Sequence, residues 1–211
     1  MPSNALPRPS ENARNGFVMN APILRAVECL PMTGRLIYVI GPSGSGKDSV
    51  IDYARARLPA DSNVVFARRT ITRPAEAGGE RHEAVTPEAF DKRLAQGGFA
   101  MHWHANGLSY GIGREIGDWL ESGRTVVVSG SRAHLPDAMA EFPALEVVHV
   151  SAPLETLKHR LAARGREDAA QVARRIERAA RLGLPAGTQA FEISNDGELA
   201  NAGESLLAFI T

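Results

Sequence analysis

A glycine-rich turn between an apolar run and a helical pattern constrains the fold of this chain more than any other feature. Residues 38–51 read YVIGPSGSGKDSVI, and the turn has the spacing G-x-x-x-x-G-K from Gly41 to Lys47. The apolar run 35–40 predicts a buried strand, and the residues from Lys47 onward predict a helix. Strand, turn and helix together predict a phosphate-binding loop in an α/β protein.

Such a loop binds phosphate because its backbone N–H groups and the following helix N-terminus point at the oxygens. We expect Lys47 to reach the β- and γ-phosphates of ATP. A chance glycine-rich turn is the alternative, but the strand before it and the helix after it both fit the motif. The residues predicted to bind ATP here are Gly41, Pro42, Ser43, Gly44, Ser45, Gly46, Lys47, Asp48 and Ser49.

Asp48 departs from the usual motif, in which Ser or Thr follows the lysine and its hydroxyl binds Mg²⁺. Two interpretations of Asp48 stay open. Its carboxylate is a suitable Mg²⁺ ligand, with Ser49 beside it as a second oxygen donor. Alternatively, the negative charge only favours the first turn of the helix, in which case Ser49 contacts a phosphate.

Strand and helix patterns alternate along the rest of the chain, which predicts a parallel sheet flanked by helices. The expected strands are 35–40, 63–72, 125–130, 145–152 and 189–196. The expected helices are 48–58, 86–98, 113–123, 131–142, 153–165, 167–182 and 198–210. Ligands bind at the carboxyl ends of such strands, so the phosphate-binding loop, the RRTITR segment at 68–73 and the SGSR segment at 129–132 should form the site.

Composition narrows the function classes. The chain of 211 residues is 44% hydrophobic and 23% charged, as is ordinary for a globular protein. Lys plus Arg and Asp plus Glu are both 24, which argues against a general nucleic-acid binder. No run approaches 18 apolar residues and the N-terminus carries no compact apolar segment. We therefore expect a cytoplasmic protein without membrane or nucleic-acid partners.

Residues 1–33 differ from the rest, because they are rich in Pro, Asn, Ser and Arg and lack clear periodicity. Such a segment buries too little apolar surface to offset the entropy lost on ordering. We therefore expect a disordered tail, with a partner-binding segment as the alternative. Residues 34–211 are expected to form one P-loop domain.

The segment RRTITRPAEAGGERHE resembles the phosphate-acceptor region of guanylate kinases, and the resemblance extends in order over residues 35–211. Matching positions in the acceptor region are Thr70, Thr72, Arg73, Gly79 and Glu80. Further matches are Phe99, Trp103, Gly107, Tyr110, Gly111, the lid arginines Arg160, Arg164, Arg174 and Arg175, and the last-strand residues Asn195 and Asp196. The resemblance implies a P-loop sheet with an acceptor-binding region and an arginine-bearing lid.

The chain lacks residues with which guanylate kinases read guanine. His102 replaces the glutamate before the tryptophan, and Ser129-Gly130-Ser131 stands where an aspartate is expected. A guanine pocket without acceptors leaves buried donors unpaired, at about 1–3 kcal/mol each. These departures argue against GMP as the phosphate acceptor.

The variants GPSGSGKDS, ITRP, WHANGLSYGIG and VVVSGSRAHLP together resemble the ribose 1,5-bisphosphokinases of phosphonate degradation. The resemblance implies transfer of the ATP γ-phosphoryl group to the 1-phosphate of ribose 1,5-bisphosphate, giving 5-phosphoribosyl 1-diphosphate and ADP. We expect ATP and Mg²⁺ as cofactors, and a monomer or homodimer. The predicted catalytic residues are Lys47, Arg73, Arg164 and Arg175, with Asn195 beside ATP. The predicted acceptor-binding residues are Arg69, Arg73, Glu80, His82, His102, Tyr110 and Arg132.

Two other functions remain alternatives: a nucleoside monophosphate kinase, and a non-catalytic module of guanylate-kinase type. The second predicts a decayed loop, whereas Lys47 and the loop glycines are intact. The pair His102 and His104 offers two ligands without a third, which favours an acceptor-pocket or core role over a zinc site.

Overall fold

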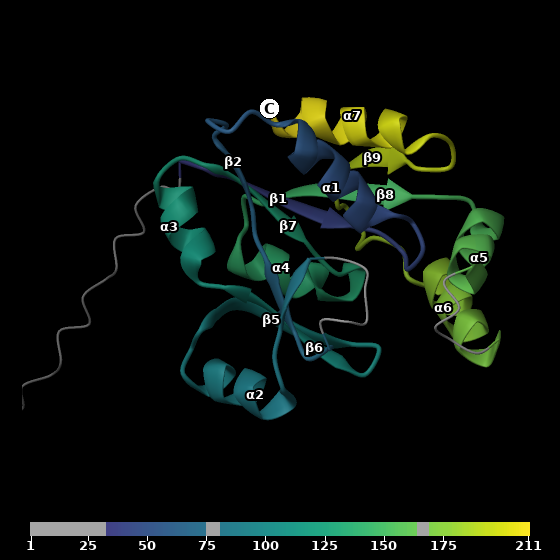
Figure 1. Ribbon diagram of the computed structural model, residues 1–211, viewed down its shortest axis with the longest axis horizontal. Coiled ribbons are helices and arrows are strands. Elements are labelled where there is room, and N and C mark those ends of the chain that lie inside the picture. The colour runs from purple at the N-terminus through teal and green to yellow at the C-terminus, as the bar shows by residue number, and fades with distance from the viewer. Residues whose placement is uncertain (1–32, 75–80, 164–168) are drawn as a thin grey trace, which may run out of the picture.

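Five parallel strands form the central sheet of the structure, a computed structural model that describes residues 33–74, 81–163 and 169–211 (Figure 1). The strand order is β2-β7-β1-β8-β9. The strands are β1 (Arg35–Ile40), β2 (Val64–Phe66), β7 (Thr125–Ser129), β8 (Glu146–Ser151) and β9 (Ala190–Ser194). The central strand β1 leads directly into the glycine-rich turn, as the sequence predicts.

Helices cover both faces of this sheet, because the side chains of its buried strands alternate between two hydrophobic clusters. The covering helices are α1 (Lys47–Arg57), α3 (Glu115–Glu121), α4 (Leu135–Glu141) and α7 (Leu199–Ile210). Ile37 and Val39 of β1 pack on the face that α1 and α7 cover. Leu36, Tyr38 and Ile40 pack on the other face, with residues of α3 and α4.

A second sheet of four strands, in the order β4-β3-β6-β5, packs on the α3 and α4 side. Its elements are β3 (Arg69–Ile71), β4 (His82–Ala84), β5 (Phe99–Ala105) and β6 (Leu108–Gly113), with α2 (Pro87–Ala95) between β4 and β5. Asn106 and Gly107, with φ of 53° and 74°, join β5 to β6 in a two-residue turn. The expected helix 86–98 corresponds to α2, which Thr86 caps by accepting from the Ala89 amide, but this second sheet was not expected.

The expected strand 63–72 is divided in the structure, with β2 in the central sheet and β3 in the second one. Two residues separate them, and the Ala67 amide still donates to the Val127 carbonyl of β7. Beyond that point, β3 turns away and pairs antiparallel with β6, so that Thr70 lies opposite Gly111. The division places the acceptor-region residues on a separate sheet, facing the glycine-rich turn.

Two further helices, α5 (Leu154–Ala163) and α6 (Ala169–Arg181), lie together at one end of the molecule (Figure 1). They follow β8 and contain the segment that resembles a lid. Within the ranges that the structure describes, no helix is long and apolar enough to cross a membrane. The predicted tail, residues 1–33, lies outside the described residues except for Thr33.

Candidate active site

The glycine-rich turn has the backbone geometry that a phosphate-binding loop requires. Gly44 and Gly46 have φ of 91° and 80°, which side-chain-bearing residues rarely adopt. The Ser45 amide donates to the Pro42 carbonyl at 3.1 Å, and α1 begins at Lys47, directly after the turn. The loop therefore presents a helix N-terminus to the space above it, where an anion is favoured.

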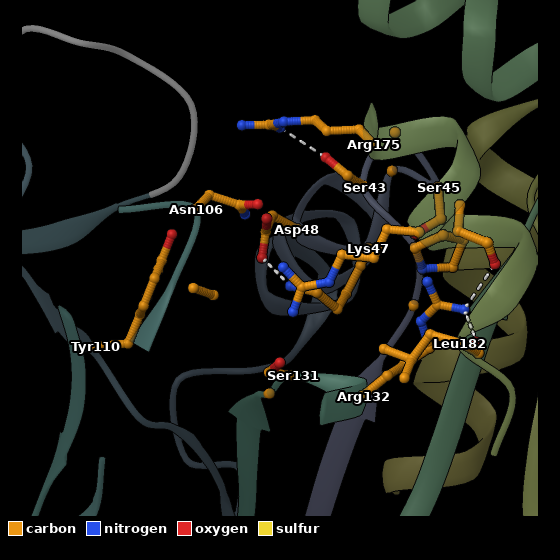
Figure 2. A pocket seen from close by; sticks show the side chains of 18 of the residues that line it. Ser43, Ser45, Lys47, Asp48, Asn106, Tyr110, Ser131, Arg132, Arg175 and Leu182 are labelled. Atoms are coloured by element: carbon orange, nitrogen blue, oxygen red, sulfur yellow. Dashed lines mark hydrogen bonds and ion pairs between the residues drawn. The ribbon is translucent and has the colours of Figure 1, made fainter. Parts of the chain in front are cut away.

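A cavity of about 360 Å³ lies between this loop, the second sheet and helix α6 (Figure 2). Every predicted loop residue from Gly41 to Ser49 lines it. The second sheet and the loop after β7 contribute Arg69, Arg73, Trp103, Ala105, Asn106, Leu108, Tyr110, Gly130, Ser131 and Arg132. Helices α5 and α6 and the residue after α6 contribute Leu161, Arg175, Arg178, Ala179 and Leu182.

The cavity is strongly positive although the whole chain is neutral. Its cationic side chains are Lys47, Arg69, Arg73, Arg132, Arg175 and Arg178. Asp48 is the only acidic side chain among the described residues that line it. Arginine binds phosphate through a planar pair of donors, so the lining fits a ligand that carries several phosphates.

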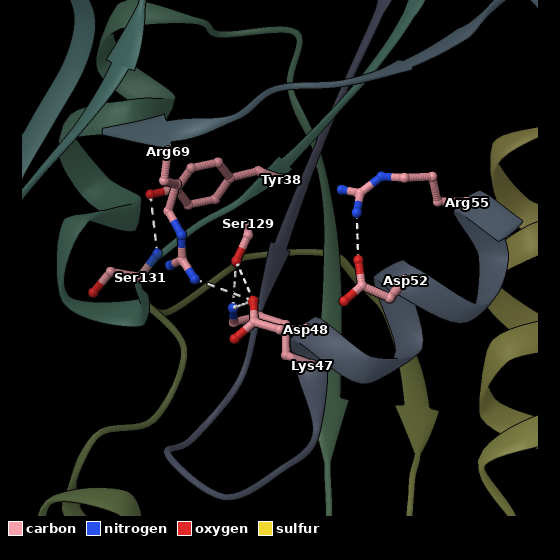
Figure 3. A network of polar contacts seen from close by, with 8 residues as sticks. All are labelled: Tyr38, Lys47, Asp48, Asp52, Arg55, Arg69, Ser129 and Ser131. Atoms are coloured by element: carbon pink, nitrogen blue, oxygen red, sulfur yellow. Dashed lines mark hydrogen bonds and ion pairs between the residues drawn. The ribbon is translucent and has the colours of Figure 1, made fainter. Parts of the chain in front are cut away.

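Asp48 joins the loop to the second sheet through one carboxylate oxygen (Figure 3). Lys47 donates to Asp48 Oδ1 at 2.7 Å, the Ser129 hydroxyl donates to it at 2.7 Å, and Arg69 donates to it at 3.1 Å. The protein atoms packed around Asp48 desolvate its carboxylate and raise its pKa, but Lys47, Arg69 and the Ser129 hydroxyl outweigh this effect and hold that pKa below its ordinary range. Asp48 is therefore a carboxylate at neutral pH.

Arg69 is held rigidly at the base of the cavity. Its side chain is only 7% exposed and packs over the ring of Tyr110, with its guanidinium carbon 5.6 Å from the ring centre. Tyr110 stacks in turn on Trp103, whose ring centre lies 5.4 Å away at an angle of 1°. Trp103 stacks on His134 at 5.2 Å, so an aromatic column supports the predicted acceptor residues Arg69 and Tyr110.

His82 contacts Arg73 instead of lining the cavity. Its ring is buried, with Nε2 lying 3.1 Å from the Arg73 carbonyl and Nδ1 lying 3.4 Å from the Arg73 guanidinium. Arg73 itself lines the cavity. The structure therefore brings both predicted residues together, with His82 placed to orient Arg73.

Helix α6 reaches the loop through Arg175, which donates to the Ser43 hydroxyl at 2.8 Å (Figure 2). Arg132 points at the end of the same helix and donates to the carbonyls of Ala179 and Leu182. Burial, together with the neighbouring charge of Arg178, lowers the pKa of Arg132. Arg178 lies one turn after Arg175 and also lines the cavity, whereas Arg174, which was expected as a lid arginine together with Arg175, does not line it.

Besides His82, two predicted residues lie away from the cavity lining. His102 is exposed because residues alternate along β5, so that its neighbour Trp103 faces inward. Asn195 is buried behind the loop, where its amide donates to the Ser45 carbonyl at 2.7 Å. Glu80 and Arg164 fall outside the described residues, so their predicted roles have no structural description.

Replacing Asn195 with alanine is expected to lower the free energy of unfolding by about 1–3 kcal/mol, because the Ser45 carbonyl loses a buried donor. Urea unfolding measures the change, and the exposed Asn201→Ala variant is the matched control. Equal stability of Asn195→Ala and wild type would contradict the supporting role of this side chain.

The cavity also offers oxygen ligands that fit Mg²⁺, an ion that usually takes one or two carboxylates together with substrate phosphates. Asp48 supplies a carboxylate at the start of α1, the Ser129 hydroxyl contacts it, and Ser49 lines the cavity next in sequence. Among the residues with described positions, no group of three or more His, Cys, Asp or Glu side chains forms an all-protein metal site. These groups therefore fit a metal that arrives with a nucleotide.

Comparisons with known proteins agree with this geometry. A family model described as "AAA domain" matches residues 37–182. The crystal structure of guanylate kinase from Anaplasma phagocytophilum superimposes with a TM-score of 0.62 at 17% identity, covering 84% of each chain. At that identity the likeness concerns the fold alone, and it confirms the predicted guanylate-kinase-like sheet.

Relatives in several bacteria are much closer in sequence. Ribose 1,5-bisphosphate phosphokinase PhnN from Thiobacillus denitrificans is 52% identical over 178 residues, which are 84% of this chain and 93% of that protein. The proteins of the same name from Desulfomicrobium baculatum and Pseudomonas fluorescens are 48% and 51% identical, covering 83% of this chain and 94% of each relative. The chain therefore belongs to the ribose 1,5-bisphosphate phosphokinase PhnN family of P-loop proteins.

Proposed function

We propose that this protein transfers the γ-phosphoryl group of ATP to the 1-phosphate of ribose 1,5-bisphosphate. The products are ADP and 5-phosphoribosyl 1-diphosphate. A P-loop kinase uses a nucleotide, and the relatives at about half identity are named for this substrate. The observation that carries the proposal is the cavity itself, in which a complete phosphate-binding loop faces arginines from a second sheet and from α6.

In the proposed reaction, an oxygen of the acceptor 1-phosphate attacks the γ-phosphorus of ATP as the bond to the ADP oxygen breaks. A phosphate acceptor is already ionised near neutral pH, so the transfer requires no general base, unlike a transfer to a sugar hydroxyl. The site is consistent with a reaction without a general base, because Asp48, the acidic side chain of the cavity lining, is paired with Lys47 and Arg69. Catalysis then rests on positioning and on neutralising phosphate charge.

The cationic side chains of the cavity can be assigned to different phosphates by the elements from which they extend. Lys47 extends from the loop and is placed for the β- and γ-phosphates, as in other P-loops. Arg69 and Arg73 belong to the second sheet and the loop that follows β3, and we assign them to the phosphates of the acceptor. Arg175 reaches the loop from α6 and is assigned to the transferring group.

Mg²⁺ bound with ATP would be held by Asp48, with Ser49 nearby, and would neutralise charge on the β- and γ-phosphates. We further propose that the protein works in the cytoplasm as a monomer or homodimer, on a small molecule and without nucleic-acid or membrane partners. The even balance of 24 cationic and 24 acidic residues supports the absence of a nucleic-acid partner.

A coupled assay of ADP production tests the acceptor. Wild-type protein is given ATP and Mg²⁺ with ribose 1,5-bisphosphate, with GMP or with no acceptor, each in a separate reaction. We expect turnover with the sugar bisphosphate and none above background with GMP, and ³¹P NMR should show the diphosphate at the sugar C1 position. Robust turnover of GMP with none of the sugar bisphosphate would overturn the proposal.

Replacing Arg175 with alanine is expected to lower kcat about tenfold or more, with a smaller effect on the KM of the acceptor. The reason is that Arg175 reaches the loop at Ser43 and would stabilise charge that develops during transfer. Steady-state kinetics measure the change. Arg181→Ala is the matched control, since Arg181 ends the same helix with a highly exposed side chain that pairs with Glu177. Equal kcat values for the two variants would contradict the role of Arg175.

A further inference from the structure

The two side chains that meet above the loop carry the functional groups of an ordinary P-loop magnesium site, but at exchanged positions. In many P-loop enzymes, Mg²⁺ is held by a hydroxyl of the residue after the loop lysine and by an aspartate from a second motif. Here the residue after the loop lysine is the carboxylate Asp48. The hydroxyl that meets it is supplied by Ser129, which lies 81 residues later.

The fold explains how these two residues meet. Ser129 is the last residue of β7, the strand that pairs directly with β1, and Val39 of β1 lies opposite it. The loop and Ser129 therefore leave neighbouring parallel strands at the same edge of the sheet, where ligands bind. The Ser129 hydroxyl donates to Asp48 Oδ1 at 2.7 Å, and Lys47 donates to both side chains (Figure 3).

We propose that Asp48 and Ser129 form an exchanged carboxylate–hydroxyl pair that holds the Mg²⁺ of the bound nucleotide. The inference rests on the proposed function only in that the nucleotide is ATP, and it does not depend on the acceptor. The Ser129 hydroxyl and Asp48 Oδ1 are 2.7 Å apart. Exchanging the carboxylate and the hydroxyl between the two positions therefore shifts each oxygen ligand by only a short distance. Ser129, the last residue of β7, thereby becomes a metal-site residue, whereas the sequence alone predicts only that the loop at this strand end belongs to the site.

The exposure of Asp48 supports a ligand role over a purely structural one. Its side chain is 40% exposed and lines the cavity, whereas its partner Arg69 is 7% exposed. The carboxylate is therefore accessible to an incoming ion. Lys47 now bonds both Asp48 and Ser129, and phosphates in the loop would compete for its ammonium, leaving these oxygens to a cation.

Binding of Mn²⁺ provides a test that needs no turnover. The probe is Mn²⁺ with a non-hydrolysable ATP analogue, and electron paramagnetic resonance of free Mn²⁺ gives its affinity with and without protein. The quantity compared is the factor by which the protein tightens Mn²⁺ binding to the analogue. Asp48→Ser should reduce this factor about tenfold or more. Adding Ser129→Asp to that variant should restore most of the loss, because the carboxylate returns at the other position.

Asp48→Ser combined with Ser131→Asp is the matched control. It restores the same net charge two residues away, where the Ser131 amide donates to the Tyr38 hydroxyl at 3.2 Å and the Ser131 side chain lies apart from Asp48 (Figure 3). If this control restored Mn²⁺ binding as well as Ser129→Asp does, the proposal would be overturned, since a negative charge anywhere in the cavity would then be sufficient. Retained Mn²⁺ binding in Asp48→Ser, or no restoration by Ser129→Asp, would also overturn it.

Two single variants keep the test decisive if the double variant is poorly folded, as its thermal midpoint would show. Asp48→Asn and Ser129→Ala nearly preserve side-chain shape and should each weaken Mn²⁺ binding. Unchanged binding in either one overturns the exchanged pair. The assay contains no acceptor, so its failure is separate from failure of the proposed sugar bisphosphate reaction, which the wild-type ADP assay decides.

Discussion

Replacing Lys47 with methionine is expected to lower kcat for ADP formation by about 10²- to 10³-fold. The Lys47 side chain extends from the first residue of α1, directly after the loop. In P-loops, the ammonium group of this lysine neutralises charge on the β- and γ-phosphates. Methionine keeps most of the length of the side chain but removes its charge. The loss should therefore exceed that of any single acceptor contact and fall mainly on kcat.

Steady-state kinetics with saturating ribose 1,5-bisphosphate measure the Lys47→Met effect, with circular dichroism to check folding. The matched control is Lys92→Met, which removes an exposed lysine on α2, away from the cavity lining. The control should behave as wild type. A loss of less than about tenfold in Lys47→Met would contradict direct contact between Lys47 and the transferring phosphates.

The loop was predictable from the sequence because its signal is local. Strand, glycines, lysine and helix occupy one continuous stretch, and the backbone geometry of Gly44 and Gly46 follows from it. The helices were predictable for a similar reason, since α2 carries both a capping threonine and apolar residues at helical spacing.

The second sheet was missed for two different reasons. β4 is three residues long, which is too short for a periodic pattern to identify, and β3 was predicted only as the end of one continuous strand 63–72. β5 and β6 did carry a signal, because buried Met101 and Trp103 alternate with exposed residues and Asn106-Gly107 is a favoured hairpin turn. That hairpin could have been predicted from its alternation and its turn.

The rest of the site depends on proximity that no spacing along the chain reveals. Ser129 and Asp48 meet only because β7 pairs with β1. Arg178 lines the cavity because α6 is arginine-rich on several sides and only the packing of the helix decides which side faces inward. His102 lies off the cavity because the register of β5 places Trp103 inward. Tertiary contacts therefore select the site residues from candidates that the sequence leaves equivalent.

Replacing Arg69 with methionine is expected to lower kcat/KM for ribose 1,5-bisphosphate by about 10²-fold. Arg69 is nearly buried at the base of the cavity, with Tyr110 packed against it and Asp48 as its ion-pair partner. A desolvated arginine whose geometry is already fixed binds phosphate without a further entropy cost, and removing one partner of such a pair costs about 2–5 kcal/mol. The KM for ATP should change far less.

Two further variants separate the acceptor role of Arg69 from a structural one. Arg69→Lys keeps the charge but loses the planar pair of donors, so kcat/KM for the acceptor should fall between wild type and Arg69→Met. Arg68→Met removes the neighbouring arginine, which is exposed, lies outside the cavity lining and donates to the His82 carbonyl at 2.8 Å, so it should stay near wild type. If Arg69→Met weakens ATP binding as strongly as acceptor binding, Arg69 acts through Asp48 and the loop, and its assignment to the acceptor phosphate is wrong.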